Sequence, residues 1–415
     1  MAQDAATSTL DTGDTAWMLA SAALVLFMTP GLALFYGGMT RQKNMLGTIM
    51  HSFFIIGLVS VHWAVIGYTL AFGTDIGGLI GGFDYLFLNG VGQGPSPFAK
   101  TIPDLLFVMY QGMFAVITPA LISGAYAERM RFGPYVVFTL LWVTLVYSPI
   151  AHWVWGGGWM GAGHLGALDF AGGTVVHISS GVAALAAALV LGRRLGWPRE
   201  PVLPHNLPFT VLGAGILWFG WFGFNAGSAL ASNGLAASAF AATHLAAAAA
   251  TVSWGLAEYL ERGKASVLGA ASGSVAGLVA ITPAAGFVGP MPALLIGAVA
   301  GVLCYFAVTV KFRLGYDDSL DVVGVHGAGG TWGALATGLF ASTAVNASGA
   351  DGLFYGNAAQ FGIQAVSVAA TIAYSFVASL ILFKVVDATM GLRASEEEEV
   401  MGLDLSQHGE RAYSL

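Results

Sequence analysis

Residues 173–194 read GTVVHISSGVAALAAALVLGRR, an uncharged run that is closed by two arginines. A helix of about 20 apolar residues crosses the hydrocarbon core of a bilayer. Lys and Arg gather next to such helices on the cytoplasmic side. This stretch therefore predicts a transmembrane helix that ends at the cytoplasm.

Ten more stretches share this character, and the chain as a whole is 56% hydrophobic and only 9% charged. A soluble domain is about 25% charged, so a soluble protein is excluded. The sequence predicts an all-α polytopic membrane protein with 11 transmembrane helices. The predicted spans, none of which contains Asp, Glu, Lys or Arg, are 16–36, 46–71, 105–126, 133–153, 173–192, 208–225, 235–257, 268–285, 292–310, 322–342 and 361–383.

The basic residues predict the orientation of these spans. Fourteen of the 15 Lys and Arg residues fall on one side of the alternating spans, and only Lys100 falls on the other. The positive-inside rule then places the N-terminus outside and the C-terminus in the cytoplasm, which an odd number of spans allows. We expect the protein in the cytoplasmic (inner) cell membrane. The fourteen are Arg41, Lys43, Arg129, Arg131, Arg193, Arg194, Arg199, Arg262, Lys264, Lys311, Arg313, Lys384, Arg393 and Arg411.

The chain divides into three predicted parts: an extracytoplasmic N-terminus at 1–15, an eleven-helix domain at 16–386 and a cytoplasmic tail at 387–415. The tail is too short for a catalytic domain, so we interpret it as a regulatory or docking segment. It carries Glu396–Glu399, a large part of the net charge of −7. That acidity argues against a nucleic-acid partner.

Five spans followed by five more must have opposite orientations, which is the inverted-repeat design of many transporters. We predict repeat one at about 16–195, repeat two at about 205–342 and an extra helix at about 361–386. The last span of each half offers a similar string. Asp169 precedes His177 in the first half, and Asp321 precedes His326 in the second, each near a glycine-rich start.

Histidines within membrane spans are functional candidates, although a lone one such as His244 is more simply explained by packing. In regular helices, His177 and His326 would lie near opposite membrane surfaces. They can meet only if the glycine-rich segments before them enter the membrane irregularly, which is allowed where backbone lines a cavity. A passage without carboxylates does not hold a bare cation well. Neutral imidazoles suit a small polar molecule or a relayed proton.

Aromatic residues gather where the exterior mouth is expected. An aromatic belt at the membrane interface explains many tryptophans, whereas a cation–π vestibule would attract a monovalent cation without a carboxylate. Composition leaves both interpretations open. The residues are Tyr110, Phe114, Trp153, Trp155, Trp159, Phe222 and Phe224, with Ser228 beside them.

Several strings in order along almost the whole chain resemble the ammonium transporter family, the Amt/Mep/Rh proteins, and most closely its bacterial and archaeal Amt branch. The resemblance implies eleven helices per subunit, a homotrimer and one pore through each subunit. The strings are FYGG at 35–38, GAYAERMR at 124–131, AHWVWGGG at 151–158, LDFAGGTVVH at 168–177, PHNLP at 204–208, GWFGFNAGS at 220–228 and DVVGVHG at 321–327.

The resemblance also implies a role for each matching position. Tyr110 departs slightly, because relatives often have Phe there. Asp169 matches an acid that either assists deprotonation or, as we favour, holds backbone amides at the helix start. The implied sites are an external ammonium site of Trp155, Ser228 and Phe114 with Tyr110 beside it, a phenylalanine gate of Phe114 and Phe224, and a twin-histidine pair of His177 and His326.

The function implied by the resemblance is an ammonium transporter or ammonia channel, not an enzyme. Ammonium, with methylammonium as a possible second substrate, would lose its proton near the gate and cross as ammonia, with or without a separate proton relay. The tail resembles a segment that contacts neighbouring subunits and a P-II-type nitrogen regulatory protein. We expect membrane lipid around the protein, and no cofactor or metal site. The alternatives are an ammonium sensor and a channel for methylamine, carbon dioxide or urea.

Overall fold

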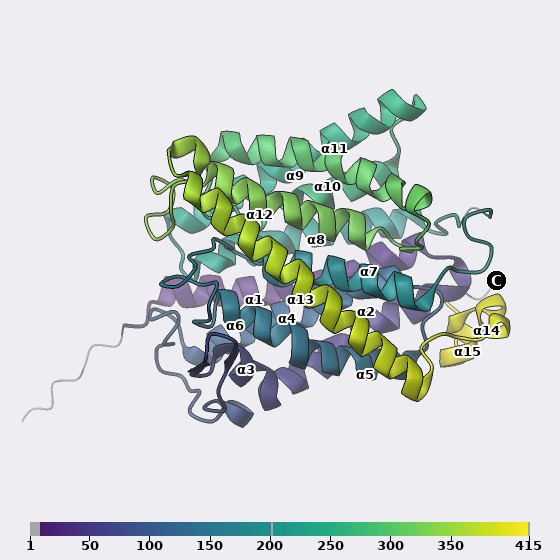
Figure 1. Ribbon diagram of the computed structural model, residues 1–415, viewed down its shortest axis with the longest axis horizontal. Helices are drawn as coiled ribbons and strands as arrows, with labels where there is room; N and C mark the ends of the chain where they lie inside the picture. The colour runs from purple at the N-terminus through teal and green to yellow at the C-terminus, as the bar shows by residue number, and fades with distance from the viewer. Residues whose placement is uncertain (1–8, 201, 414–415) are drawn as a thin grey trace, which may run out of the picture.

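The computed structural model describes residues 9–200 and 202–413. Its helices run side by side along the longest axis of the molecule (Figure 1). The two short helices of the C-terminal tail lie at one end, which we call the tail end, and the loops at 73–103 and 155–172 lie at the opposite, loop end. Of the predicted N-terminal segment, residues 1–8 lie outside the described part of the chain.

The first half of the chain is helical apart from the loops at the loop end, one of which contains a two-stranded hairpin. Two of its η segments, η2 and η4, interrupt long helices as π-helices, and η5 begins the fifth span as one. The elements are α1 (Thr12–Met39), η1 (Gln42–Asn44), α2 (Met45–His62), η2 (Trp63–Gly67), α3 (Tyr68–Phe72), β1 (Asp75–Ile76), β2 (Ile80–Gly81), η3 (Leu86–Leu88), α4 (Asp104–Tyr126), α5 (Phe132–Trp142), η4 (Val143–Tyr147), α6 (Ser148–Val154), η5 (Gly173–Ile178) and α7 (Ser179–Leu191).

The second half repeats the use of a π-helix where the tenth span begins, at η7. The elements are α8 (Leu207–Ala226), η6 (Gly227–Ala229), α9 (Gly234–Arg262), α10 (Val267–Ile281), α11 (Pro290–Leu314), η7 (Val323–Ala328), α12 (Gly329–Phe340), η8 (Leu353–Tyr355), α13 (Ala358–Met390), α14 (Glu396–Met401) and α15 (Leu403–His408).

Nine helical segments in the described part of the chain are long and apolar enough to cross a membrane. Each of the eleven predicted stretches overlaps one of these nine, or α10, or the η7–α12 segment. Most helices run past the predicted span ends; α11, for example, continues to Leu314. α10 instead ends at Ile281, short of the predicted residue 285, because Pro283 cannot continue the hydrogen-bonding pattern.

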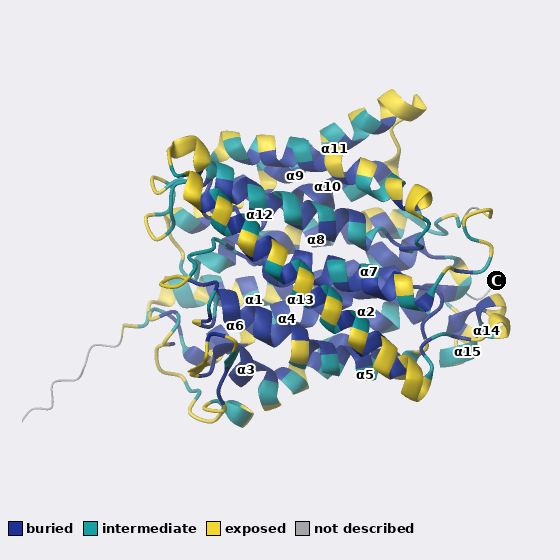
Figure 2. Ribbon diagram, in the orientation of Figure 1, coloured by how far each residue is buried: buried dark blue, intermediate teal, exposed yellow. Residues whose placement is uncertain are grey.

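Small residues bring the helices together. α1 packs along α8, and a Cβ on Gly213 of α8 would lie 2.3 Å from the backbone nitrogen of Phe35. Such close approach is how helices associate in a membrane, where lipid is as apolar as the helix surface. The outer face of α13 carries exposed positions along its length (Figure 2). Val377 and Ile381 are exposed apolar side chains of this helix.

The tail is docked on the tail end of the bundle through backbone and side-chain hydrogen bonds. Ala394 N–H donates to the Arg129 carbonyl at 2.9 Å. Lys43 Nζ donates to the Glu399 carbonyl at 2.8 Å, and Asp404 Oδ1 accepts the Gly47 N–H at 2.8 Å at the start of α2. Acidic residues 396–399 thus belong to an ordered helix rather than to a free acidic extension.

A buried ion cluster joins the connections at the tail end. Glu128 lies between Arg41 and Arg194, at 2.9 and 3.4 Å, and Arg194 forms a two-pronged pair with Asp317, with one N–O distance of 2.8 Å. Burial alone would raise the pKa of Asp317, but the hydrogen bonds and charge of Arg194 and the charge of Arg129 hold it below its ordinary value. The cluster therefore stays ionised at neutral pH.

Candidate functional site

The two predicted histidines meet in the middle of the bundle. η5 carries His177, η7 carries His326, and the two π-helices pack against each other. The Nδ1 atoms lie 3.2 Å apart, and the ring centroids are 5.3 Å apart with an interplanar angle of 27°. The sequence predicted that the histidines could meet only if the chain entered the membrane irregularly. Both histidines lie on π-helices, an irregular form often found at functional sites.

Glycines make this crossing possible. A Cβ on Gly181 would lie 2.2 Å from the backbone nitrogen of Gly327, and a Cβ on Gly330 would lie 2.9 Å from the Cβ of His177. Larger residues at these places would push η5 and η7 apart. The glycine-rich pattern around each histidine is therefore explained by close backbone approach.

Thr282, which sequence reasoning missed, decides which ring nitrogen carries a proton. Its hydroxyl donates to the Leu278 carbonyl at 2.7 Å and accepts from Trp221 Nε1–H at 2.9 Å. Since a hydroxyl has one proton, Thr282 Oγ1 can only accept from His177 Nε2, which lies 3.3 Å away. A neutral His177 then has a bare Nδ1, and His326 Nδ1–H donates to it.

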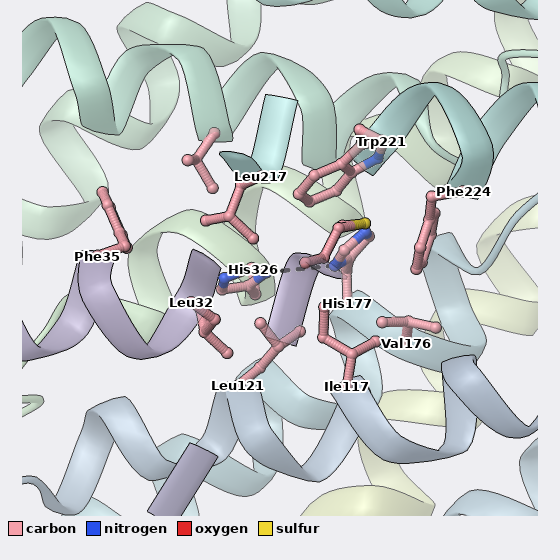
Figure 3. A pocket seen from close by; sticks show the side chains of 12 residues that line it. Leu32, Phe35, Ile117, Leu121, Val176, His177, Leu217, Trp221, Phe224 and His326 are labelled. Carbon is pink, nitrogen blue, oxygen red and sulfur yellow. Dashed lines mark hydrogen bonds between the residues drawn. The ribbon is translucent and has the colours of Figure 1, made fainter. Parts of the chain in front are cut away.

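The histidines line a narrow cavity of about 10 Å³ (Figure 3), a volume that holds one water-sized molecule. Phe224 lies on one side of the pair and Phe35 and Leu32 lie on the other. Among the described residues no carboxylate lines this cavity, and the two imidazoles are its principal polar groups. The lining residues are Met28, Leu32, Phe35, Ile117, Leu121, Val176, His177, Leu217, Trp221, Phe224, Val275 and His326.

Phe114 and Phe224 lie against each other between the histidines and the loop end. Their centroids are 4.2 Å apart, and each side chain is 1% exposed. Phe224 lies 6.1 Å from His177, so the two phenylalanines and the histidine pair are consecutive along one path. α4 and α8 supply these rings from opposite halves of the chain.

On the loop-end side of Phe114, Trp155 and Tyr110 meet its ring edge to face, at 5.9 and 5.0 Å. Trp155 is held by its Nε1–H, which donates to the Asp169 carbonyl at 3.0 Å. The Tyr110 hydroxyl lies 3.2 Å from Ser228 Oγ. Two of the other predicted residues of the external site therefore contact Phe114 directly, and Ser228 adjoins it through Tyr110.

Other aromatic residues of the predicted mouth lie elsewhere. Phe222 stacks on Phe240 of α9 at 3.8 Å, away from the cavity. Trp153 donates to the Leu79 carbonyl and packs on Trp159, so both tryptophans hold the hairpin loop. The sequence grouped these residues because they are near in the chain, whereas helical geometry turns neighbouring side chains to different faces.

Asp169 caps the first π-helix. Its two carboxylate oxygens accept the backbone N–H groups of Gly172, Gly173, Thr174 and Val175, and it also accepts from the Thr174 hydroxyl. Both oxygens are therefore occupied by protein donors. This geometry matches the capping role that we favoured from the sequence.

The corresponding acid of the second half is Asp318, not Asp321, and our prediction is corrected here. Asp318 Oδ2 accepts the Val323 N–H at 2.7 Å at the start of η7. Asp321 has a positive φ of 65° and pairs with Lys311 at 2.5 Å. The spacing could have revealed this, since Asp318 precedes His326 by the same eight residues that separate Asp169 from His177.

Comparisons with known proteins agree with this geometry. The family model for the Ammonium Transporter Family matches residues 16–413. The ammonium transporter of Bacillus subtilis is 55% identical over 402 residues, covering 97% of this chain and 98% of the relative. Ammonium transporter Amt1 of Archaeoglobus fulgidus is 49% identical over 402 residues, covering 97% and 99%.

Solved structures agree as well. Candida albicans Mep2 superposes with a TM-score of 0.89 at 39% identity, covering 98% of this chain and 91% of that one. A structure of a "Sensor Amt Protein" superposes with a TM-score of 0.87 at 31% identity, covering 95% and 98%. The chain is a multi-span membrane transport protein rather than an enzyme, and it belongs to the ammonium transporter family.

Proposed function

We propose that this protein recruits ammonium at an external aromatic site, removes its proton near the phenylalanine pair and conducts ammonia past His177 and His326. In this proposal the loop end faces outside, and the tail end faces the cytoplasm. The basic residues at the tail end support this orientation through the positive-inside rule. The membrane is then the cytoplasmic, or inner, cell membrane.

The external site is the group around Phe114. Ring faces of Trp155 and Phe114 attract a monovalent cation through their quadrupoles. Ser228 Oγ–H donates to the Phe224 carbonyl at 2.9 Å, which leaves an oxygen lone pair for an ammonium N–H. Tyr110 supports Ser228 through its own hydroxyl, which contacts the Gly223 and Phe224 carbonyls at 3.0 and 2.9 Å.

The narrow passage selects against charge. Beyond Phe224 the path is apolar except for the imidazoles, so a cation that kept its charge would lose hydration without compensation. Ammonium can lose a proton and continue as ammonia. Potassium has no proton to lose and is expected to be excluded.

One observation carries this proposal: the 3.2 Å contact between two imidazole nitrogens in an apolar cavity without a carboxylate. A neutral pair of this kind can accept a hydrogen bond from ammonia but has no charge to hold a metal or an alkali ion. In the hydrogen-bonding pattern derived above, His326 Nε2 is an acceptor, which suits an ammonia N–H.

The test is current recorded from the purified protein in liposomes on a solid-supported membrane. We expect current with ammonium and none with potassium, and a changed current in a His177→Ala/His326→Ala double variant. A separate proton relay predicts electrogenic transport, whereas passage of ammonia alone predicts an interior pH change without current. Unaltered ammonium current in the double variant would overturn the proposed path, and His244→Ala is the control. If ammonium failed to compete with methylammonium for uptake, ammonium would be excluded as the substrate.

A sensor is the alternative, since one structural neighbour carries the name "Sensor Amt Protein". In a sensor, the same external site would bind ammonium while the pore stays closed, and the docked tail would report occupancy. Ammonium binding to the protein without either current or an interior pH change in the liposomes would favour this function.

The assembly and partners are part of the proposal. We infer a homotrimer with one pore per subunit, and a P-II-type regulatory protein that binds the tail at 387–415. The equivalent positions of Asp169 and Asp318 support two inverted repeats at about 16–195 and 205–342, with the helix at 361–386 added. The oligomer mass in detergent, with and without added P-II-type protein, tests both.

A further inference from the structure

A buried histidine at the loop end is bonded through both of its ring nitrogens. His152 lies on α6, and its side chain is 0% exposed. Its Nδ1 atom lies 2.9 Å from the Ala71 carbonyl oxygen of α3, and its Nε2 atom lies 2.8 Å from Asp75 Oδ1 of β1. α3 and α6 lie side by side at this end of the molecule (Figure 1).

The two partners determine how many protons the ring carries. A carbonyl oxygen and a carboxylate oxygen only accept hydrogen bonds, whereas a neutral imidazole has a single N–H to donate. In a neutral His152 beside a carboxylate, one ring nitrogen would therefore direct its lone pair at an oxygen 2.8 or 2.9 Å away. Both contacts are satisfied when His152 is an imidazolium with two N–H groups.

Asp75 is the carboxylate of this pair rather than a neutral acid. The Gly78 N–H donates to its Oδ1 and Oδ2 atoms, at 2.8 and 3.0 Å. The hydrogen bond from His152, together with that from Gly78, holds the pKa of the Asp75 carboxyl below its ordinary value. The proton of the pair therefore belongs to His152, whose Nε2–H donates to Asp75.

The other titratable groups near this pair can be named. α6 packs against α3, β2, η4 and η5, and the titratable side chains on these four elements are Tyr68, Tyr147 and His177. Among the described residues, Asp75 is the only titratable side chain that forms a hydrogen bond or an ion pair with His152. Asp75 also faces the exposed His164, whose charge lowers the pKa of Asp75 further. His164 therefore needs a control of its own.

The backbone of His152 holds the turn that begins at Trp155. The His152 carbonyl accepts the N–H groups of Gly156 and Gly158, at 3.1 and 2.9 Å. A Cβ on Gly156 would lie 1.9 Å from the Ala71 carbonyl oxygen and 2.7 Å from His152 Nδ1, so the turn closes directly over the ring. The glycine run after Trp155 is thus explained by packing against this histidine. His152 joins the end of α3, the hairpin and the turn that carries Trp155.

We propose that His152 is a positively charged positioning residue, whose ion pair with Asp75 fastens the hairpin at 75–81 and the Trp155 turn beside the external site. Loss of its ring proton at alkaline pH would break one of the two contacts, loosen the hairpin and weaken the recruitment of ammonium. The effect on recruitment rests on the proposed function, whereas the protonation of His152 does not.

The protonation test is solid-state ¹⁵N nuclear magnetic resonance of the full-length protein, labelled at histidine, in liposomes at neutral pH. The difference between wild type and His152→Gln should contain the two protonated ring nitrogens of an imidazolium. In Asp75→Asn the new amide can donate to Nε2 of a neutral His152, whose Nδ1–H still donates to Ala71. The imidazolium signal should therefore be absent in Asp75→Asn. A neutral His152 in the wild type, or an imidazolium that persists in Asp75→Asn, would overturn the proposal.

The loosening of the hairpin is measured by hydrogen–deuterium exchange of residues 73–82, with the loop at 343–352 as the reference for the chemical effect of pH on amides. In the wild type, exchange at 73–82 should rise from neutral to alkaline pH by more than in the reference loop. Asp75→Asn should remove this excess, because its two ring contacts need no extra proton. Asp75→Asn also carries the test if His152→Gln does not fold.

Two control variants should retain the excess exchange. Asp84→Asn changes a carboxylate of the same loop that accepts the Thr74 N–H at 2.7 Å, and His164→Gln removes the other histidine facing Asp75. An equal excess in wild type and Asp75→Asn, or its loss in His164→Gln, would overturn the assignment to His152.

The transport arm compares the KM and the maximal rate for ammonium in liposomes over the same pH range. Wild type and Asp75→Asn meet the same mixture of ammonium and ammonia at each pH, so their KM ratio reports the protein alone. At alkaline pH the wild-type KM should rise by about five-fold relative to Asp75→Asn, the effect of roughly one lost hydrogen bond on an equilibrium. The ratio of maximal rates should stay level, because the pore residues are unchanged.

A KM ratio that does not vary with pH would overturn the link between His152 and recruitment. Absence of ammonium current and of an interior pH change in every protein would instead count against the proposed function. The two failures are distinguishable, because the resonance and exchange measurements do not depend on transport.

Discussion

Asp169 and Asp318 each lie eight residues before a pore histidine, and each carboxylate accepts backbone N–H groups at the start of the π-helix that carries it. Asp169 uses both oxygens, whereas the Oδ1 atom of Asp318 is buried without a hydrogen-bond partner in the described chain. Burial raises the pKa of Asp318 to about 6. In both halves an aspartate thus caps a π-helix, but only Asp169 has protein donors on both carboxylate oxygens.

Asp169→Ala should destabilise the protein by roughly 2–4 kcal/mol, because buried N–H groups lose their acceptor at ~1–3 kcal/mol each when unsatisfied. Asp169→Asn keeps one acceptor oxygen and should retain part of both stability and transport. Thermal unfolding and ammonium current, measured on both variants, check this. A fully stable but inactive Asp169→Asn would contradict capping and assign Asp169 to deprotonation.

His177→Ala or His326→Ala should change ammonium conduction or selectivity while the oligomer still assembles. Each substitution removes one partner of the 3.2 Å contact, at a cost in stability of roughly 1–3 kcal/mol. Currents with ammonium and potassium, and the mass in detergent, are the measurements. His244→Ala is the matched control, since His244 is exposed on α9. Loss of the oligomer would mean that the histidines are structural.

Tyr110→Phe should raise the apparent KM for ammonium by roughly 2–10-fold, because one hydrogen bond contributes ~0.5–1.5 kcal/mol. The ring against Phe114 remains, but Ser228 loses the neighbouring hydroxyl that holds it. The maximal rate should change little, since the site binds before the gate. Concentration dependence of the current measures both parameters, with Tyr374→Phe, which loses a bond to the Leu145 carbonyl, as the control. An unchanged KM would exclude Tyr110 from the external site.

The tail end should lose stability in acid. The pKa of Asp317 is lowered in the folded protein, so its contribution is present above its unfolded pKa of ~3.9 and is lost as pH falls below that value. The midpoint temperature of thermal unfolding should therefore stay nearly level from pH 7 to about pH 4 and fall as the pH is lowered further, to about 2.5. Asp317→Asn should be less stable at pH 7 by roughly 3–5 kcal/mol, because Arg194 and Arg129 remain buried.

The Asp317→Asn variant also tests whether Asp317 causes the loss of stability in acid. Asp317→Asn should show a flatter acid limb than the wild type, and an Asp317→Asn/Arg194→Gln double variant, which leaves fewer unpaired charges, should recover part of the stability. An acid limb as steep in both variants as in the wild type would assign the pH dependence to another group, such as Glu128, whose pKa is also lowered.

Hydropathy and charge predicted the helices well, because a membrane imposes one requirement on every span. A segment that crosses lipid must satisfy its backbone internally and must be apolar for about 20 residues. Both properties are local, so they can be read from 16–36 or 361–383 without knowing the neighbours. The helix ends were less accurate, since α11 and α13 continue past the predicted span ends to Leu314 and Met390.

The arrangement of the pore residues could be predicted only from the resemblance to a family. From spacing alone, His177 and His326 would lie near opposite surfaces, and nothing local in the sequence required η5 and η7 to be π-helices. The pattern favours Asp321 as the second acid because it stands at the start of the predicted span. Only the fold turns Asp321 to Lys311 and Asp318 to Val323.

A polytopic membrane protein with alternating basic connections can be predicted without a structure, because length, hydropathy and charge are properties of each segment. The tertiary structure decided the Thr282 contact that sets the proton on His177 and the separation of Phe222 from Phe224. These features arise between helices distant in sequence. Their distances are set by packing of small residues such as Gly181 and Gly330 rather than by any local pattern.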